Sequence, residues 1–382
     1  MWWRFACRGV TGPEALSPKK DFKDFNFTTT NTNLTPGCQN HYRHLYHILY
    51  LYWVSVWNFH RERLFLITCT LFNPAVDVVY KIDGFELGAT RLDVPSYSVP
   101  SGKGLNVARV VRTLGEEVAV AGLIPKNDMR RFELFIEDQG ITPLLYEMPG
   151  SARVNITLID GQAPPCVTHI NSAAARLPVS VQEEFLQFLA WHAENGGRWC
   201  FSGSLPEFSG ALPEGFGNDA YLRIINACKD KGANCLLDTR GKAFKVGVGA
   251  APQAVKPNLE ELGEFFGQEI MGVQHIALCA KRFLDLGVQY VFISLGSDGL
   301  IAVHGNECLL CSPPDVKVVD TVGCGDALVA GIMVAQEREF SFADTCRMAV
   351  ACGSSKSMHE GPGIITRDEV WQLMEDVEIK EI

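Results

Sequence analysis

The sequence predicts an α/β protein with a mostly parallel central sheet and helices on both of its faces. Two observations lead to this prediction. Short apolar runs of strand length alternate with helical segments along most of the chain, and glycine-containing loops follow several of these runs. Right-handed crossovers between parallel strands then place helices on both faces, and ligands bind at the carboxyl ends of the strands.

The expected elements follow in chain order. A first strand at 65–71 leads into Asn73-Pro-Ala-Val-Asp77, and short β-like pieces at 78–100 turn at Gly84 and Gly88. Side chains in a strand alternate between faces, so Arg153, Asn155 and Thr157 share one face of their strand. The remaining expected strands are at 118–124, 153–160, 198–202, 234–238 and 290–295. The remaining expected helices are at 105–114, ended by Gly115, from the capping box Ser180-x-x-Glu183 to about 195, between the strands at 198–202 and 234–238, and at 273–286.

The first 64 residues differ from the rest of the chain. Residues 1–60 hold 13 of the 38 aromatic residues. The apolar stretch 42–57 is shorter than the roughly 20 residues of a membrane span, and Arg43, His44 and His47 interrupt its start. We expect 1–64 to be an atypical, poorly ordered N-terminal extension or a misassigned start, with a membrane anchor as the alternative. The functional domain is expected at 65–382.

Composition restricts the class of function. The net charge of −10 argues against nucleic-acid binding, which needs a basic face, but a local group of cations can still hold an anionic small substrate. The 13 cysteines lack regular spacing, which indicates reduced thiols and a cytoplasmic protein.

The segment Thr321-Val-Gly-Cys-Gly-Asp326 is the main candidate for chemistry. It precedes an apolar helical run at 327–335, and glycines at a helix start let the backbone approach a ligand closely. Free N–H groups and the helix dipole favour an anion there. Asp326 could accept the proton of an attacking hydroxyl during phosphoryl transfer. The alternative is an aspartate that the helix dipole alone favours.

From about residue 65 the chain resembles the pfkB (ribokinase-like) carbohydrate kinases. Asp320–Asp326 matches their D-T-x-G-x-G-D signature, and Asn258 and Glu261 match N-x-x-E. Ser101–Asn106 matches G-G-K-G-x-N, with Ser101 in place of the first glycine. The resemblance implies a ribokinase-like three-layer α/β/α sandwich and a small β lid, formed by pieces near 78–100 and 151–170.

The resemblance also implies roles for site residues, with ATP as phosphoryl donor. Asp326 corresponds to the catalytic base, and Asn258 and Glu261 to the pair that organises Mg²⁺, usually through water. The family's anion hole corresponds to Gly323, Cys324 and Gly325. Nucleotide-binding positions correspond to Lys256, Ser294, Gly296, Gly299 and Gly353, the last expected in an adenine-side loop together with Gly361 and Gly363.

Other motifs resemble the 1-phosphofructokinase and tagatose-6-phosphate kinase branch, which implies a ketohexose phosphate as substrate. Asn73–Asp77 matches N-P-A-x-D, and Arg153-Val-Asn155 resembles T-R-x-N, with Ala152 in place of threonine. Arginine binds phosphate bidentately. Expected substrate-binding residues are Asp77 for sugar hydroxyls, Arg153 and Lys103 for phosphate, Arg91 as a second phosphate contact, and Gly102 and Asn106 in the glycine loop.

Two other functions stay open on the sequence. One is a kinase for an unphosphorylated sugar or a nucleoside, and the other is a sugar-phosphate sensor without catalysis. The lid would have exposed edges that could pair with a second copy, so we also expect a homodimer through the lid.

Overall fold

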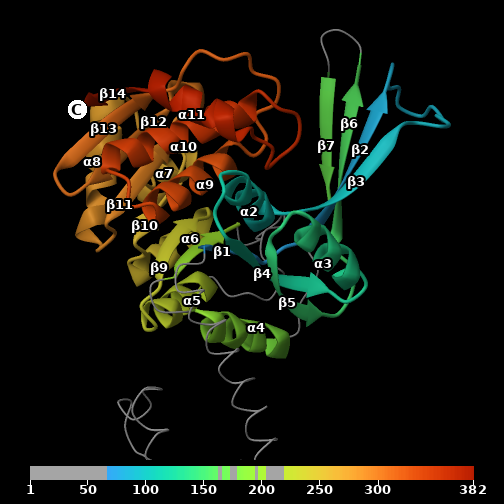
Figure 1. Cartoon of the computed structure of the whole chain (residues 1–382), viewed down its shortest axis with the longest axis horizontal. Helices are drawn as coiled ribbons and strands as arrows, with labels where there is room; N and C mark the ends of the chain where they lie inside the picture. The colour runs from blue at the N-terminus through green and yellow to red at the C-terminus, as the bar shows by residue number, and fades with distance from the viewer. Residues whose placement is uncertain (1–66, 162–165, 173–178, 194–196, 204–218) are drawn as a thin grey trace, which may run out of the picture. The chain divides into compact units, whose positions relative to one another are not determined.

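The computed structural model describes residues 67–161, 166–172, 179–193, 197–203 and 219–382 (Figure 1). The predictions for segment 1–64 therefore fall outside the described residues. The described chain forms a ten-stranded sheet with helices on both faces and a separate four-stranded sheet.

The ten-stranded sheet is parallel over most of its width. From β5 to β11 every pair of neighbours is parallel, and the three remaining pairs at the other edge are antiparallel. In spatial order the strands are β14 (Glu378–Glu381), β13 (Glu307–Ser312), β12 (Leu300–His304), β11 (Tyr290–Ser294), β10 (Ala254–Val255), β9 (Asn234–Asp238), β8 (Arg198–Ser202), β1 (Ile67–Leu71), β4 (Val118–Pro125) and β5 (Thr142–Met148).

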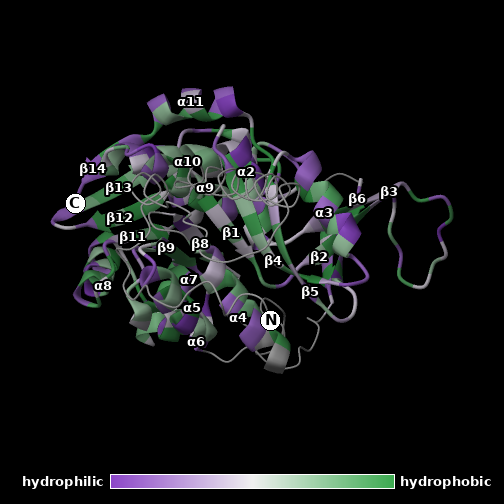
Figure 2. Cartoon of the chain, turned by 60° about the horizontal axis from the view of Figure 1, so that its bottom comes forward, coloured by the Kyte–Doolittle hydropathy of each residue, from purple (hydrophilic) through white to green (hydrophobic). Residues whose placement is uncertain are grey.

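Two hydrophobic cores, one on each face of this sheet, complete a three-layer sandwich. One core involves α2 (Lys103–Thr113), α3 (Met129–Asp138), α9 (Cys324–Glu337), α10 (Phe342–Ser357) and α11 (Arg367–Asp376). The other involves α4 (Val179–His192), α5 (Ala220–Lys229), α6 (Gly241–Gly247), α7 (Leu259–Phe266) and α8 (Val273–Asp285). In Figure 2 the outer helix α11 is largely hydrophilic, whereas α9 and α10 beneath it are more hydrophobic. The predicted fold class is confirmed.

Several predicted elements appear at their predicted residues. The strands expected at 153–160, 198–202 and 234–238 have those bounds. The helix expected at 105–114 begins two residues earlier, at Lys103, and Gly115 follows it with a φ of +101°, the left-handed conformation that glycine adopts at helix ends. The helical run expected at 327–335 extends over the whole of α9, which begins at Cys324 and so includes the last three residues of the glycine motif.

The smaller sheet contains β3 (Ser96–Ser101), β2 (Ala75–Ile82), β6 (Arg153–Asp160) and β7 (Cys166–Asn171), in that spatial order. Residues 72–74 alone join β1 of the large sheet to β2 of the small one, and Gly102 alone joins β3 to α2. A Cβ on Gly104 would lie 2.0 Å from the Thr70 carbonyl oxygen, so α2 can start against the end of β1 only because residue 104 is glycine.

Within the described ranges, no helix has both the length and the apolar character needed to cross a bilayer. None of the cysteines described there forms a disulfide, and most are buried.

Candidate active site

The first turn of α9 carries the predicted anion hole. Gly323 caps the helix with a φ of +86°, a conformation that favours glycine. The N–H of Cys324 already donates to the Thr321 carbonyl at 3.3 Å. The N–H groups of Gly325 and Asp326 belong to the first turn, which has no carbonyl one turn back to accept them within the helix. These two N–H groups are therefore better placed for an anion than that of Cys324.

Asp326 lies in this turn and is only 6% exposed. Its Oδ2 accepts a hydrogen bond from Asn106 Nδ2 at 3.0 Å, and its Oδ1 lies 4.0 Å from Lys103 Nζ. Burial raises the pKa of Asp326, the negative charge of Asp238 adds to the rise, and Lys103 and Asn106 oppose it. The carboxylate is thus a stronger base than an exposed aspartate would be.

Asp238 joins the two lysines of the site. It opens the motif Asp238-Thr-Arg-Gly241, which resembles the 1-phosphofructokinase branch, but the sequence assigned it no role. It ends β9 and is 1% exposed, with Oδ2 3.1 Å from Lys103 Nζ and Oδ1 3.2 Å from Lys256 Nζ. Burial alone would raise its pKa, but the charges and hydrogen bonds of the two lysines outweigh it and hold the pKa of Asp238 below its ordinary value. A carboxylate at the carboxyl end of a buried strand was the available signal.

Lys103 and Lys256 both lie near the first turn of α9, where their positive charges could attract an anionic ligand. Burial opposes the charge of Lys103, but Asp238, Asp326 and Glu261 outweigh it, and the net pKa of Lys103 is raised. A lysine whose pKa is raised keeps its positive charge at neutral pH. Lys256 Nζ lies 3.9 Å from the position that a Cβ on Gly325 would occupy, so this buried ammonium sits beside the anion hole.

The N-x-x-E pair forms a capping box at the start of α7. Asn258 accepts from the Glu261 N–H at 2.8 Å, and the Glu261 carboxylate accepts from the Asn258 N–H at 2.9 Å. Burial raises the pKa of Glu261, partly offset by the charge of Lys256. In the described part of the chain, no three His, Cys, Asp or Glu residues cluster as a metal cage would require. Asn258 and Glu261 are oxygen-bearing residues that could contact a magnesium ion through its waters.

A second polar group lies on the small sheet. Asp77 and Asn155 face each other across β2 and β6, with Asn155 Nδ2 donating to Asp77 Oδ1 at 2.8 Å. Arg153 Nη1 donates to Asn155 Oδ1 at 3.1 Å, and its buried Nε has no protein partner. Burial lowers the pKa of Arg153, against the charge of Asp77. The shared face predicted for Arg153 and Asn155 matches this geometry.

The strand register fixes how the two polar groups relate. Arg153 pairs with Ala75, and Ala75 pairs with Ser101 on its other side. Arg153 is thus two strand spacings, roughly 10 Å, from the residue that precedes Gly102 and Lys103. The structure brings Asp77, Gly102, Lys103, Asn106, Arg153 and Asp326 to one region.

Arg91 lies elsewhere. It is exposed in the loop that joins β2 to β3, at the end of these strands opposite to Ala75 and Ser101. Its Nη2 donates to the carbonyl of Gly84 in the same loop. Of the predicted phosphate contacts, Arg91 is the one that the structure does not bring to the other site residues.

The predicted nucleotide loop joins β11 to β12. Ser294 ends β11 and pairs with Asn258, which ties the loop to the start of α7. Gly296 begins a short 3₁₀ turn. A Cβ on Gly299 would lie 2.0 Å from the Cys311 carbonyl oxygen. Packing therefore requires glycine at this position, whether or not the loop contacts a nucleotide.

Gly353 is in the body of α10, and the expectation that it lies in a loop is wrong. A Cβ there would lie 3.6 Å from the Cys324 carbonyl oxygen, so Gly353 packs beside the first turn of α9. The residues from Val350 to Ser357 continue the helix because nearly all of them bury side chains against its neighbours. Gly361 and Gly363 do lie in the loop that follows, both with positive φ.

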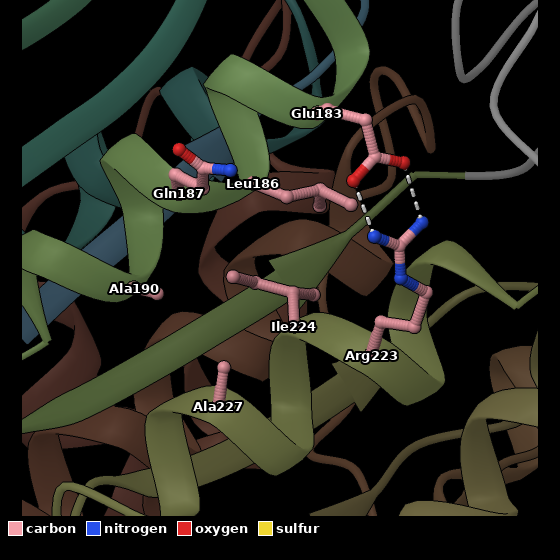
Figure 3. Close-up of a pocket in the computed structure, with 7 residues that line it drawn as sticks. All are labelled: Glu183, Leu186, Gln187, Ala190, Arg223, Ile224 and Ala227. Carbon is pink, nitrogen blue, oxygen red and sulfur yellow. Dashed lines mark hydrogen bonds and ion pairs between the residues drawn. The ribbon is translucent and has the colours of Figure 1, made fainter. Parts of the chain in front are cut away.

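A groove of about 200 Å³ between α4 and α5 contains none of these residues (Figure 3). Its charged side chains, Glu183 and Arg223, neutralise each other through hydrogen bonds of 2.8 and 2.5 Å. The rest of its lining is mainly aliphatic. It lacks the convergent cations and carboxylates of the region around Asp326.

Comparisons with known proteins identify the family of the chain. The chain is 29% identical to the 1-phosphofructokinase of Rhodobacter capsulatus over 310 residues, covering 81% of this chain and 96% of the relative. It is 31% identical to the 1-phosphofructokinase of Escherichia coli K12, covering 82% and 97%. The crystal structure of phosphofructokinase-2 from Escherichia coli in complex with substrates and products has the same fold, with a TM-score of 0.74, 22% identity and coverage of 82% and 99%. Residues 76–367 match the pfkB family carbohydrate kinase model, and the chain belongs to this family.

Proposed function

We propose that this protein transfers the γ-phosphoryl group of ATP to a hydroxyl of a ketohexose phosphate, of the fructose 1-phosphate or tagatose 6-phosphate type. The observation that carries the proposal is the buried carboxylate of Asp326, placed in the first turn of α9 between Asn106 and Lys103. The curated relatives named 1-phosphofructokinase support the substrate class.

Asp326 acts as general base. The hydrogen bond from Asn106 occupies Oδ2 and orients the carboxylate, so Oδ1 is directed to the hydroxyl of the sugar. The N–H groups of Gly325 and Asp326 stabilise negative charge on the migrating phosphoryl group, helped by the dipole of α9. The ammonium of Lys103, 4.0 Å from Oδ1, stabilises the same charge.

ATP binds along the carboxyl edge of β10 and β11, with Lys256, Ser294, Gly296 and Gly299 as its nearest predicted contacts. A magnesium ion would be held through water by Glu261 and Asn258 and would neutralise phosphate charge. The capping box fixes both side chains at the start of α7.

The phosphate that the substrate already carries is held by Arg153. Its buried Nε lacks a partner, so a phosphate oxygen would satisfy a polar group that is otherwise costly to bury. Asp77 and Asn155 accept and donate hydrogen bonds to the sugar hydroxyls next to it. The small sheet acts as a lid over the substrate and excludes water from the transfer.

A panel of acceptors tests the proposal. Purified protein with ATP and Mg²⁺ is offered fructose 1-phosphate, tagatose 6-phosphate, fructose 6-phosphate, ribose and adenosine, and ADP release is measured. We expect the highest kcat/KM with a phosphorylated ketohexose. Activity confined to ribose or adenosine would replace the proposal by a kinase for neutral acceptors, and binding of a sugar phosphate without ADP release would indicate a sensor.

Two further parts of the proposal are a homodimer formed through the small sheet and a cytoplasmic location. Val154 and Ile170 are 41% and 53% exposed and share the sheet face opposite to Asp77, where a second copy would cover them. The free thiols of the described cysteines fit a reducing compartment. Light scattering should give a dimer mass for the native protein and a monomer mass for Ile170→Glu, and a monomeric native protein would contradict the proposal.

A further inference from the structure

Lys356 is a fully buried cation that the proposed reaction does not use. It lies in the last turn of α10 and has no exposed surface. Its ammonium donates to the carbonyl oxygens of His359 at 2.8 Å and Asp320 at 3.1 Å, and Asp320 Oδ2 lies 3.5 Å away. Burying a lysine is costly unless its charge is compensated. Here two carbonyl groups and one carboxylate surround it in the way that oxygen ligands surround a small metal cation.

The oxygen atoms around Lys356 belong to two loops that meet at the anion hole. Asp320 begins the loop that leads into α9, and its Oδ1 accepts from the Val322 N–H at 2.9 Å. Its Oδ2 accepts from the Gly361 N–H at 2.9 Å and so reaches the loop that follows α10. A single ammonium group therefore ties both loops to the end of α10.

The loop after α10 in turn supports the first turn of α9. A Cβ on Gly323 would lie 3.0 Å from Pro362 Cβ, so the two loops are in direct contact at the cap of α9. Arg109 of α2 donates to the Pro362 carbonyl at 2.9 Å. Burial raises the pKa of the Cys324 thiol, and the charge of Lys356 is the largest effect that opposes it, so the field of the ammonium reaches the anion hole.

We propose that Lys356 is a positioning residue for phosphoryl transfer: an internal cation that fixes loops 318–323 and 358–363 and thereby holds the first-turn N–H groups of α9 in place for the phosphoryl group. It does not touch a substrate, since it is completely buried. Its effect should therefore fall on the rate of the chemical step and leave substrate affinity largely unchanged.

The test compares Lys356→Met with a matched control, Arg338→Met. Arg338 follows the other end of α9 and likewise joins a carboxylate and a carbonyl, Glu116 at 2.7 Å and Leu114 at 2.9 Å. We expect kcat to fall about 10–100-fold in Lys356→Met with little change in either KM, because small displacements of transition-state donors are costly. Arg338→Met should lose stability and keep its kcat.

The kinetic readout rests on the proposed function, so a second readout does not need turnover. In hydrogen exchange, amides of loops 318–323 and 358–363 should exchange at least about tenfold faster in Lys356→Met than in Arg338→Met. If the wild type phosphorylates no acceptor, the proposed function fails while this comparison still tests Lys356. Wild-type protection of both loops, or a wild-type kcat, in Lys356→Met would overturn the inference.

Lys356→Met leaves the Asp320 carboxylate without its cation and could prevent folding. The double variant Lys356→Met with Asp320→Asn removes both charges and keeps an oxygen acceptor at residue 320. The inference predicts that this variant folds, exchanges quickly in both loops and retains the low kcat. A folded double variant with the wild-type kcat would likewise overturn it.

Discussion

Replacing Asp238 by asparagine tests the charge arrangement on which the site depends. The side chain of Asp238 is 1% exposed and that of Lys256 5%, and 3.2 Å separates their charged atoms. At this distance and an effective dielectric constant of about 20, their attraction is about 5 kcal/mol. Asparagine keeps one acceptor, and a hydrogen bond to a charged group is worth about 1.5–3 kcal/mol. Removing one partner of a buried pair costs about 3–5 kcal/mol in general. We therefore expect Asp238→Asn to lower the free energy of unfolding by about 3 kcal/mol.

The assay is urea unfolding in a double-mutant cycle with Lys256→Met. Asp238→Asn leaves the buried charge of Lys256 without its carboxylate, Lys256→Met leaves Asp238 with Lys103 as its only lysine partner, and the double variant removes both charges. The double variant should be less destabilised than the sum of the singles, with a coupling energy of about 1–3 kcal/mol for contacting residues. A loss below about 1 kcal/mol for Asp238→Asn, smaller than the typical cost of a buried unpaired charge, would refute the reasoning, as would strict additivity.

Four further predictions concern catalysis. Asp326→Asn should keep the circular dichroism spectrum and melting behaviour of the wild type while kcat falls about 10²–10⁴-fold, and near-normal turnover would remove Asp326 as base. Arg153→Ala should raise the KM for phosphorylated acceptors and leave the KM for ATP unchanged; an unaltered KM for the sugar phosphate would take Arg153 out of the phosphate site. The rate should fall at acid pH as Asp326 becomes protonated, starting above the range of an ordinary aspartate because burial raises its pKa. Asp238→Asn removes a negative charge near Asp326 and frees Lys103 to interact with Asp326 alone, and both changes lower the pKa of Asp326. The acid limb of the pH profile of kcat/KM should therefore move to lower pH in this variant. A shift to higher pH would contradict this account.

The fold was predictable from the sequence because its strands are local apolar runs. The strands at 198–202 and 234–238 are short, continuous buried segments with polar residues at their ends. Such apolar runs are typical of strands in a parallel sheet that is covered on both faces. The motif at Asp320–Asp326 was equally readable, because glycines at a helix start followed by a carboxylate form a short-range pattern.

The parts of the site that escaped prediction depend on long-range packing. Asp238 belongs to a motif that resembles the 1-phosphofructokinase branch, but its role as the partner of Lys103 depends on α2, which the fold brings to it. Lys356, between serines, reads as a solvated surface charge, and only the packing of the last turn of α10 buries it. Gly353 was expected in a loop because the resemblance to the kinase family places an adenine-side loop there, but the buried residues around it continue α10 through this position.

The short connections between the two sheets have a mechanical consequence. The chain leaves β1 for β2 through residues 72–74 and returns from β3 into α2 through Gly102, whose φ is +143°. Both connections are too short to take up a movement of the small sheet. A rotation of the small sheet would therefore displace Asp77 in β2 and would also turn Lys103, the first residue of α2. If the small sheet closes over an acceptor, as proposed above, the same motion would turn Lys103 beside Asp326. We expect an acceptor too small to bring the small sheet closer to leave these two charges misaligned.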